Sequence, residues 1–116
     1  MNTGSTSEVA TEMARGKVRS RQQVLDYISS NKERLLAEYH LRRIALIGSF
    51  AREEQGPGSD VDVLLELEPG TPDIFGTKRR LQTELESAFG RHVELASERY
   101  LKPYFREDIL RDAIYV

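Results

Sequence analysis

A Gly-Ser pair and two acidic residues in an alternating pattern have the clearest chemical potential in this chain. Asp60 and Asp62 flank Val61, and ten residues separate Asp60 from the Gly48-Ser49 pair. Side chains alternate along a β-strand, so the two carboxylates would point to the same face. Carboxylates held that close repel each other unless a cation or protons intervene. Mg²⁺ suits such a pair, because it is often held by one or two carboxylates together with water and substrate phosphate.

The Gly-Ser pair supplies groups that complement a phosphate. Gly48 ends the apolar run at residues 44–47, and its missing Cβ lets the backbone approach a ligand closely. Ser49 offers a hydroxyl and a backbone N–H, and a helix beginning there would favour an anion at its N-terminus. Arg52 lies on the same turn and can pair with a phosphate, although a solvated surface arginine is an equally good interpretation. Together these residues predict a site for a nucleoside triphosphate and Mg²⁺.

The hydrophobic pattern predicts a small α/β domain with a mixed β-sheet and flanking helices that would position these residues. Helices are predicted over residues 21–39, 72–89 and from 103 onward, and strands over residues 44–47, 60–67 and 92–96. Ser20 is the predicted N-cap of the first helix, and Gly90 the terminator of the second. The second and third helices are predicted to turn the following residues toward the core: Phe75, Leu81, Leu85, Ala88 and Phe89, and then Phe105, Ile109, Leu110 and Ala113.

Length and composition limit the other classes of function. The chain has 116 residues, enough for one compact domain, and we assign residues 1–18 to a polar, flexible N-terminal segment and residues 19–116 to the domain. A net charge of −2 argues against direct nucleic-acid binding as the main activity. The absence of cysteine excludes disulfides and thiolate metal sites. No apolar run is long enough to span a membrane, so we expect a cytoplasmic protein.

The motif and its surroundings resemble a known family. Gly48-Ser49, the ten-residue spacer and Asp60-Val61-Asp62 are similar to the Gly-Ser…Asp-x-Asp motif of the DNA polymerase β-like nucleotidyltransferase superfamily. Residues 43–52 and 58–66, with the ending at residues 101–116, look like its minimal nucleotidyltransferase (MNT) branch. The resemblance implies the nucleotidyltransferase α/β core. It also implies ATP as nucleotide donor and Mg²⁺ as cofactor.

The resemblance further implies a partner. Many minimal members are encoded beside a HEPN-domain protein, with which they form toxin–antitoxin pairs. The MNT protein is then the antitoxin and can transfer AMP from ATP to a tyrosine of the HEPN ribonuclease. We therefore expect a hetero-oligomer with a HEPN toxin, in which Asp60 and Asp62 hold the metal.

The third acid departs from the family pattern. The family commonly carries Asp on its third strand, whereas Glu94 occupies the matching place here. Glu94 is one methylene longer and can still coordinate a metal or accept a proton, so we assign it as metal ligand and catalytic base beside Asp60 and Asp62. His92 shares the strand face of Glu94, and we expect it to be exposed or to support a neighbouring ligand.

Two alternatives to protein adenylylation stay open. The chain could neutralise a toxin by stoichiometric binding and occlusion without catalysis, which the substitution at the third acid motivates. It could also modify a small molecule, as antibiotic nucleotidyltransferases do. Those enzymes generally use a second domain to hold the acceptor, and a homodimer would have to supply that surface here.

Overall fold

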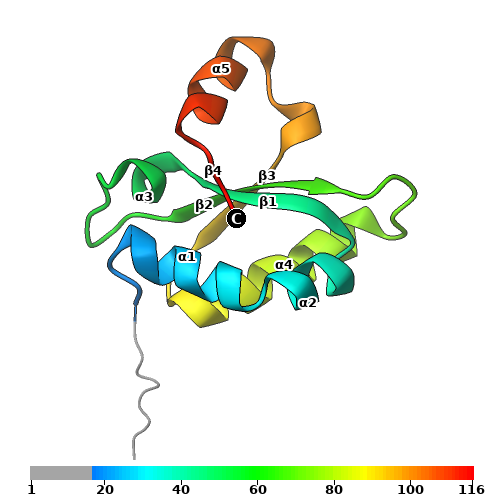
Figure 1. The fold of residues 1–116 in the computed structure, drawn as a ribbon, viewed down its shortest axis with the longest axis horizontal. Helices are drawn as coiled ribbons and strands as arrows, with labels where there is room; N and C mark the ends of the chain where they lie inside the picture. The colour runs from blue at the N-terminus through cyan, green and yellow to red at the C-terminus, as the bar shows by residue number, and fades with distance from the viewer. Residues whose placement is uncertain (1–16) are drawn as a thin grey trace, which may run out of the picture.

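A mixed four-stranded sheet forms the centre of the protein in the computed structural model, which describes residues 17–116 (Figure 1). The strands β1 (Leu41–Ile47), β2 (Val61–Leu67), β3 (Val93–Ser97) and β4 (Ile114–Tyr115) lie in the order β3-β2-β1-β4. β1 runs antiparallel to β2 and β4, and β2 runs parallel to β3. The predicted α/β class with a mixed sheet is confirmed. β4 is a strand that the sequence pattern did not predict.

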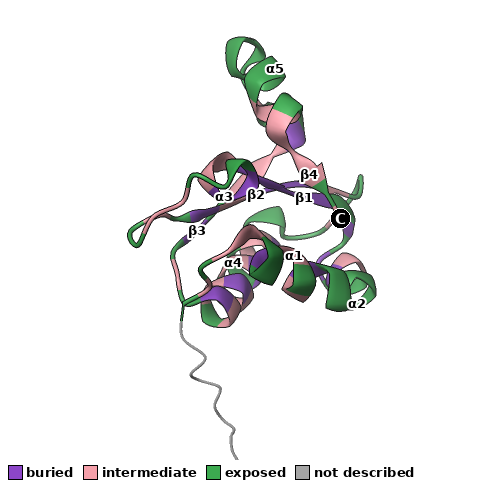
Figure 2. Ribbon diagram, turned by 60° about the vertical axis from the view of Figure 1, so that its left-hand side comes forward, coloured by how far each residue is buried: buried purple, intermediate pink, exposed green. Residues whose placement is uncertain are grey.

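Helices cover the two faces of this sheet unequally. The helices α1 (Arg21–Ser30), α2 (Lys32–Glu38) and α4 (Ile74–Phe89) lie on one face, and α5 (Pro103–Asp112) stands on the other (Figures 1 and 2). Apolar side chains of β1 and β2 point alternately to the two faces, as a strand's period of two requires. The larger core therefore lies under α1, α2 and α4, and a smaller one lies under α5. Residues of the smaller core, including Ile47 and Ile109, line a cavity together with Asp62 and Glu94.

The helical region predicted over residues 21–39 is two helices, because Asn31 interrupts it. Ser20 caps α1 as predicted, and Gln23 completes a reciprocal capping box. The Asn31 side-chain amide donates to the Tyr27 carbonyl oxygen at 2.8 Å. Such a local side-chain bond competes with helical backbone pairing, and α2 begins directly after it. The break allows α2 to place Leu35 in the core.

Two aromatic side chains assigned to the core are exposed instead. Phe75 on α4 is 76% exposed and Phe105 on α5 is 51% exposed. α4 begins at Ile74, two residues later than predicted, with Asp73 as its N-cap, and Phe75 therefore lies in its exposed first turn. Beyond Phe75, the buried face of α4 includes Leu81, Leu85 and Phe89 as predicted; the smaller core likewise receives Ile109, Leu110 and Ala113.

The described residues include the end of the segment assigned as polar. Residues 1–16 lie outside the part of the chain that the structure describes, whereas Val18 packs against the larger core and donates its N–H to the Phe89 carbonyl oxygen at 2.9 Å. Within residues 17–116, no helix has the length and apolar character that crossing a membrane requires.

Candidate functional site

The Gly-Ser turn and the Asp-x-Asp strand meet at the end of the sheet. β1 pairs with β2 in a register that sets Ile47 opposite Asp62, so Gly48 follows beside that carboxylate. Gly48 has a φ of +76°, a conformation that favours glycine. A Cβ built on Gly48 would lie 3.0 Å from the Asp62 Cβ and closer still to its carboxylate. Position 48 therefore needs glycine both for its backbone conformation and for the approach of Asp62.

The helix that follows β1 is short. α3 (Gly48–Arg52) begins at Gly48 itself, which places Gly48 and Ser49 in its first turn. The N–H groups of a first turn have no partner within the helix and can donate to an anion. Phe50 on the next position is fully buried and fixes α3 against the core. The Gly-Ser turn is thus held by packing on one side and by the close contact with Asp62 on the other.

Two of the three predicted acids, Asp62 and Glu94, lie on neighbouring strands, and Asp60 directly precedes β2. The parallel register of β2 and β3 sets Asp62 directly opposite Glu94. Asp60, His92 and Glu94 each offer one ligand atom, and these atoms all lie within 4.8 Å of one another. The carboxylate oxygens are the donors that a hard cation such as Mg²⁺ prefers, so this end of the sheet fits the metal implied by the family resemblance. Of the three predicted ligands, this cluster contains the exposed Asp60 and Glu94, together with His92, whereas the half-buried Asp62 is not part of it.

The local electrostatics disfavour ionised Asp62 and favour protonated His92. Burial raises the pKa of Asp62, and the nearby charges of Asp60 and Glu94 raise it further. A hydrogen bond to Glu94 is the main cause that raises the pKa of His92, with Asp60 and Glu86 adding to it. His92 lies 3.3 Å from a Glu94 carboxylate oxygen and 2.9 Å from one of Glu86. His92 is exposed and contacts Glu94, as expected, and its contact with Glu86 is an addition to that expectation.

A cavity of about 260 Å³ opens over these residues. Gly48, Arg52, Asp62 and Glu94 all line it, together with residues of β1, β3 and α5. Four predicted site residues therefore face one space, whereas Ser49 and Asp60 are not among its lining residues. The α5 residues in the lining, including Asp108 and Asp112, were not predicted as part of the site, because nothing in their local pattern places the helix over the end of β2.

Arg52 has a competing partner in this structure. Its Nε donates to a Glu54 carboxylate oxygen at 3.0 Å, and this hydrogen bond is the main cause that raises its pKa. The pair is exposed, and exposed pairs are weak because water screens them. Arg52 can therefore exchange Glu54 for a phosphate oxygen at little cost.

Arg91 is a positioning residue that the sequence did not reveal. Its guanidinium donates to the carbonyl oxygen of Ser59 at 2.7 Å and to those of Pro57 at 3.1 Å and Gly56 at 3.2 Å. It also donates to the Val18 carbonyl oxygen at 2.8 Å and lies over the Phe50 ring at 5.1 Å. These contacts fix the loop that leads into Asp60.

The sequence is similar to known nucleotidyltransferases over most of its length. The nucleotidyltransferase domain model matches residues 28–116. A Methanocaldococcus jannaschii protein named "putative protein adenylyltransferase" is 32% identical over 95 residues, covering 81% of this chain and 95% of that protein. Protein adenylyltransferase MntA of Thermococcus cleftensis is 28% identical over 95 residues, covering 82% of this chain and 94% of that protein.

Solved structures agree with this placement. One named "putative minimal nucleotidyltransferase" superposes with a TM-score of 0.71 at 32% identity, covering 85% of this chain and 98% of that one. A toxin–antitoxin complex with AMP-PNP reaches 0.59 at 22% identity, covering 74% and 69%, a likeness that concerns the fold alone. With the Gly-Ser turn and the strand acids meeting at one cavity, the chain belongs to the nucleotidyltransferase domain family, and it is an enzyme of the minimal nucleotidyltransferase type.

Proposed function

We propose that this enzyme transfers AMP from ATP to a tyrosine hydroxyl of a partner toxin of the HEPN class, and so acts as its antitoxin. The observation that carries the proposal is the single cavity lined by Gly48, Arg52, Asp62 and Glu94. Support for a protein acceptor comes from relatives named protein adenylyltransferases. Support for a toxin as that acceptor comes from the similar fold solved as a toxin–antitoxin complex with AMP-PNP. A soluble hetero-complex in the cytoplasm follows from this role.

Different residues of the site bind the nucleotide and the metal. Gly48 and Ser49 orient the triphosphate through backbone N–H groups and the serine hydroxyl, and Arg52 pairs with a phosphate oxygen. Asp60 and Asp62 hold Mg²⁺, with Glu94 completing the set of carboxylates. When bound, the metal neutralises charge on the phosphates and on the pyrophosphate leaving group. The raised pKa of Asp62 means that its carboxyl is costly to ionise. A bound cation would offset that cost, because it favours the ionised carboxylate.

The transfer step needs an acceptor for one proton. The tyrosine oxygen attacks the α-phosphorus of ATP, a phosphorus–oxygen bond to tyrosine forms, and the bond to pyrophosphate breaks. Glu94 takes the proton of the attacking hydroxyl, since it lines the cavity opposite Asp62, is exposed and has the reach of its extra methylene. His92, in contact with Glu94, balances the negative charge of the strand acids.

Intact mass spectrometry of the partner tests the proposal. The protein encoded beside this chain would be purified after co-expression with the wild type and with the Asp60→Asn/Asp62→Asn variant. We expect mass increments of AMP with the wild type and none with the double variant. An unmodified partner in a stable complex with the wild type would instead support neutralisation by occlusion. Increments that persist in the double variant would remove both carboxylates from the mechanism.

A further inference from the structure

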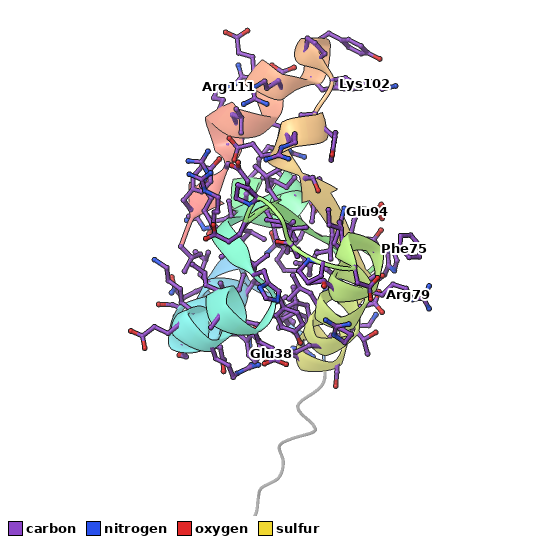
Figure 3. The ribbon with its side chains drawn as sticks, turned by 90° about the vertical axis from the view of Figure 1, so that its right-hand side faces the viewer. Glu38, Phe75, Arg79, Glu94, Lys102 and Arg111 are labelled. Atoms are coloured by element: carbon purple, nitrogen blue, oxygen red, sulfur yellow. The ribbon has the colours of Figure 1, made fainter. Side chains whose placement is uncertain are left out.

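A second cavity adjoins the cavity lined by Gly48, Arg52 and Asp62, and Glu94 lines both cavities. It has a volume of about 450 Å³ and runs between the first turns of α4 and β3. Its lining includes Ile74, Phe75, Lys78 and Arg79 from α4 and Glu94 from β3. Figure 3 shows Glu94, Phe75 and Arg79 along the same side of the molecule. We call this second cavity the α4 groove. The residue assigned to take the acceptor's proton therefore stands between two spaces, only one of which contains the Gly-Ser turn.

The α4 groove combines exposed apolar surface with positive charge. Ile74 is 49% exposed and Phe75 is 76% exposed, although both are large apolar residues. Lys78 and Arg79 follow four residues after Ile74 and Phe75, so the two apolar and two basic side chains share one helical face. Apolar patches beside polar groups mark interaction sites, and aromatic residues are typical anchors of such interfaces. This composition complements a segment that carries an apolar side chain and carboxylates.

Hydrogen bonds between α4 and β3 hold the α4 groove in shape. Gln82 donates its side-chain amide to the Val93 carbonyl oxygen at 2.8 Å, and the Lys78 ammonium donates to the Ser97 hydroxyl at 3.1 Å. At the helix start, the Asp73 carboxylate accepts the Gly76 N–H at 3.1 Å. A Cβ on Gly76 would lie 2.9 Å from the Asp73 carboxyl carbon, so glycine makes this cap possible. The exposed apolar and basic side chains thus project from a fixed frame, which lowers the entropy cost of binding.

We propose that the α4 groove docks the acceptor segment of the partner protein and sets the specificity of the transfer. This inference rests on the proposed function. The occupant is a segment in which the acceptor hydroxyl is flanked by an apolar side chain and by acidic residues. The apolar side chain packs on Phe75 and Ile74, and the acidic residues pair with Arg79 and Lys78. The hydroxyl would then approach the α-phosphorus beside Glu94, opposite the leaving pyrophosphate, which is the arrangement that in-line displacement requires.

Other exposed aromatic residues lack this relation to the site. Tyr104 and Phe105 are 71% and 51% exposed on α5, and neither lines a cavity that contains Glu94. Their position makes Tyr104 a matched control for Phe75. Arg80 is the matched control for Arg79, because it is exposed on the same helix, carries the same charge and does not line the α4 groove.

Steady-state transfer to the co-purified partner protein gives the first test. For Phe75→Ala and Arg79→Glu we expect the KM for the partner to rise about tenfold or more, while kcat at saturating partner stays within about twofold. Tyr104→Ala and Arg80→Glu should leave KM within about twofold. AMP-PNP affinity with Mg²⁺, measured by calorimetry, should be the same in all four variants. Equal effects of Arg79→Glu and Arg80→Glu, or a fall in AMP-PNP affinity, would overturn a specific docking contact.

A second test is independent of catalysis. A photo-crosslinking phenylalanine analogue would replace Phe75 in one variant and Tyr104 in another, each in the Asp60→Asn/Asp62→Asn background and co-expressed with the partner. We expect crosslinks from position 75 and not from position 104. A crosslink at 75 with an unmodified partner in the wild-type experiment would support the docking surface and refute transfer. A modified partner with no crosslink at 75 would support transfer and refute this surface.

Discussion

Acidic side chains in two regions of this small protein have pKa values shifted in opposite directions. On the helical side, Glu84 accepts hydrogen bonds from the hydroxyls of Tyr27 at 2.6 Å and Tyr39 at 2.7 Å. It also pairs with both terminal nitrogens of Arg34, at 2.5 and 3.1 Å. These donors, with Arg34 as the largest cause, lower the pKa of Glu84 to about 2. Burial, more than the Glu84 contact, raises the pKa of Tyr27 to about 12.

At the end of the sheet the shift has the other sign. Asp62 is half-buried beside the like charges of Asp60 and Glu94, and its pKa is raised. A carboxylate surrounded by donors stabilises the fold, whereas a carboxylate placed beside other acids is costly until a cation arrives. The chemical role of an acidic side chain in this protein therefore depends on the groups that surround it.

Replacing the carboxylate that faces both cavities should cost the most. For Glu94→Gln we expect kcat to fall about 100-fold or more with little change in KM for ATP, because the proton acceptor is lost. Single-turnover transfer of labelled AMP measures this rate. Glu66→Gln is the control, since Glu66 lies on β2 and pairs with exposed Arg43 at 3.1 Å, away from the cavity. If both variants lose activity equally, the assignment of Glu94 fails.

Replacing Glu84, the carboxylate surrounded by hydrogen-bond donors, should instead lower the stability of the fold. For Glu84→Gln we expect the free energy of unfolding to fall by about 2 kcal/mol, because charge-assisted hydrogen bonds from Arg34 and the two tyrosines are weakened. Urea unfolding followed by circular dichroism measures it, and transfer activity at low temperature should be unchanged. Glu38→Gln removes an exposed partner of the same arginine and should change stability by less than about 0.5 kcal/mol. Equal losses would mean that the Glu84 cluster has no special role.

The stabilising effect of Glu84 should depend on pH. Because its pKa is lowered in the folded protein, its contribution is present above its ordinary value of 4.5 and is lost as the pH falls toward about 2. The stability difference between wild type and Glu84→Gln should therefore be constant from neutral pH to about pH 5 and shrink below it. Urea unfolding of both proteins across this range measures it. A constant difference down to about pH 3 would contradict the lowered pKa.

The smallest effect should be a gain in stability at the catalytic end. Since ionised Asp62 is disfavoured by burial and by like charges, Asp62→Asn should raise the free energy of unfolding in metal-free buffer by up to about 1 kcal/mol. Asp60→Asn should gain less, because that carboxylate is exposed and water screens it. Thermal unfolding in EDTA compares the two. A loss of stability in Asp62→Asn would show that this carboxylate supports the fold.

The sequence predicted the parts of the site that depend on local pattern. Strand alternation placed Asp60 and Asp62 on one face, and the apolar runs gave the sheet class, because both follow from a period of two. The family resemblance predicted Glu94 as the acid on the third strand. In the structure, the parallel register of β2 and β3 sets Glu94 opposite Asp62, which agrees with that position. The roles of these residues stay predictions that the experiments above test.

What the sequence did not predict depends on contacts between distant segments. Arg91 acts through carbonyl oxygens about 32 or more positions away, and backbone carbonyls leave no pattern in a sequence. Asp112 joins the cavity only because α5 folds back over β2. Phe75 was assigned to the core by helical spacing, but spacing alone does not tell which turns of a helix are covered by the rest of the fold.

The guanidinium of Arg91 also links the start of the domain mechanically to the candidate site. It donates hydrogen bonds to the carbonyl oxygens of both Val18 and Ser59, and Ser59 directly precedes Asp60. Tension applied to the chain ahead of residue 17 would therefore pass through this side chain to the loop that precedes Asp60, the proposed metal ligand. A bulky affinity tag or a surface tether fused at that end would load this linkage. The site of attachment is thus a variable to control whenever the activity of this enzyme is measured.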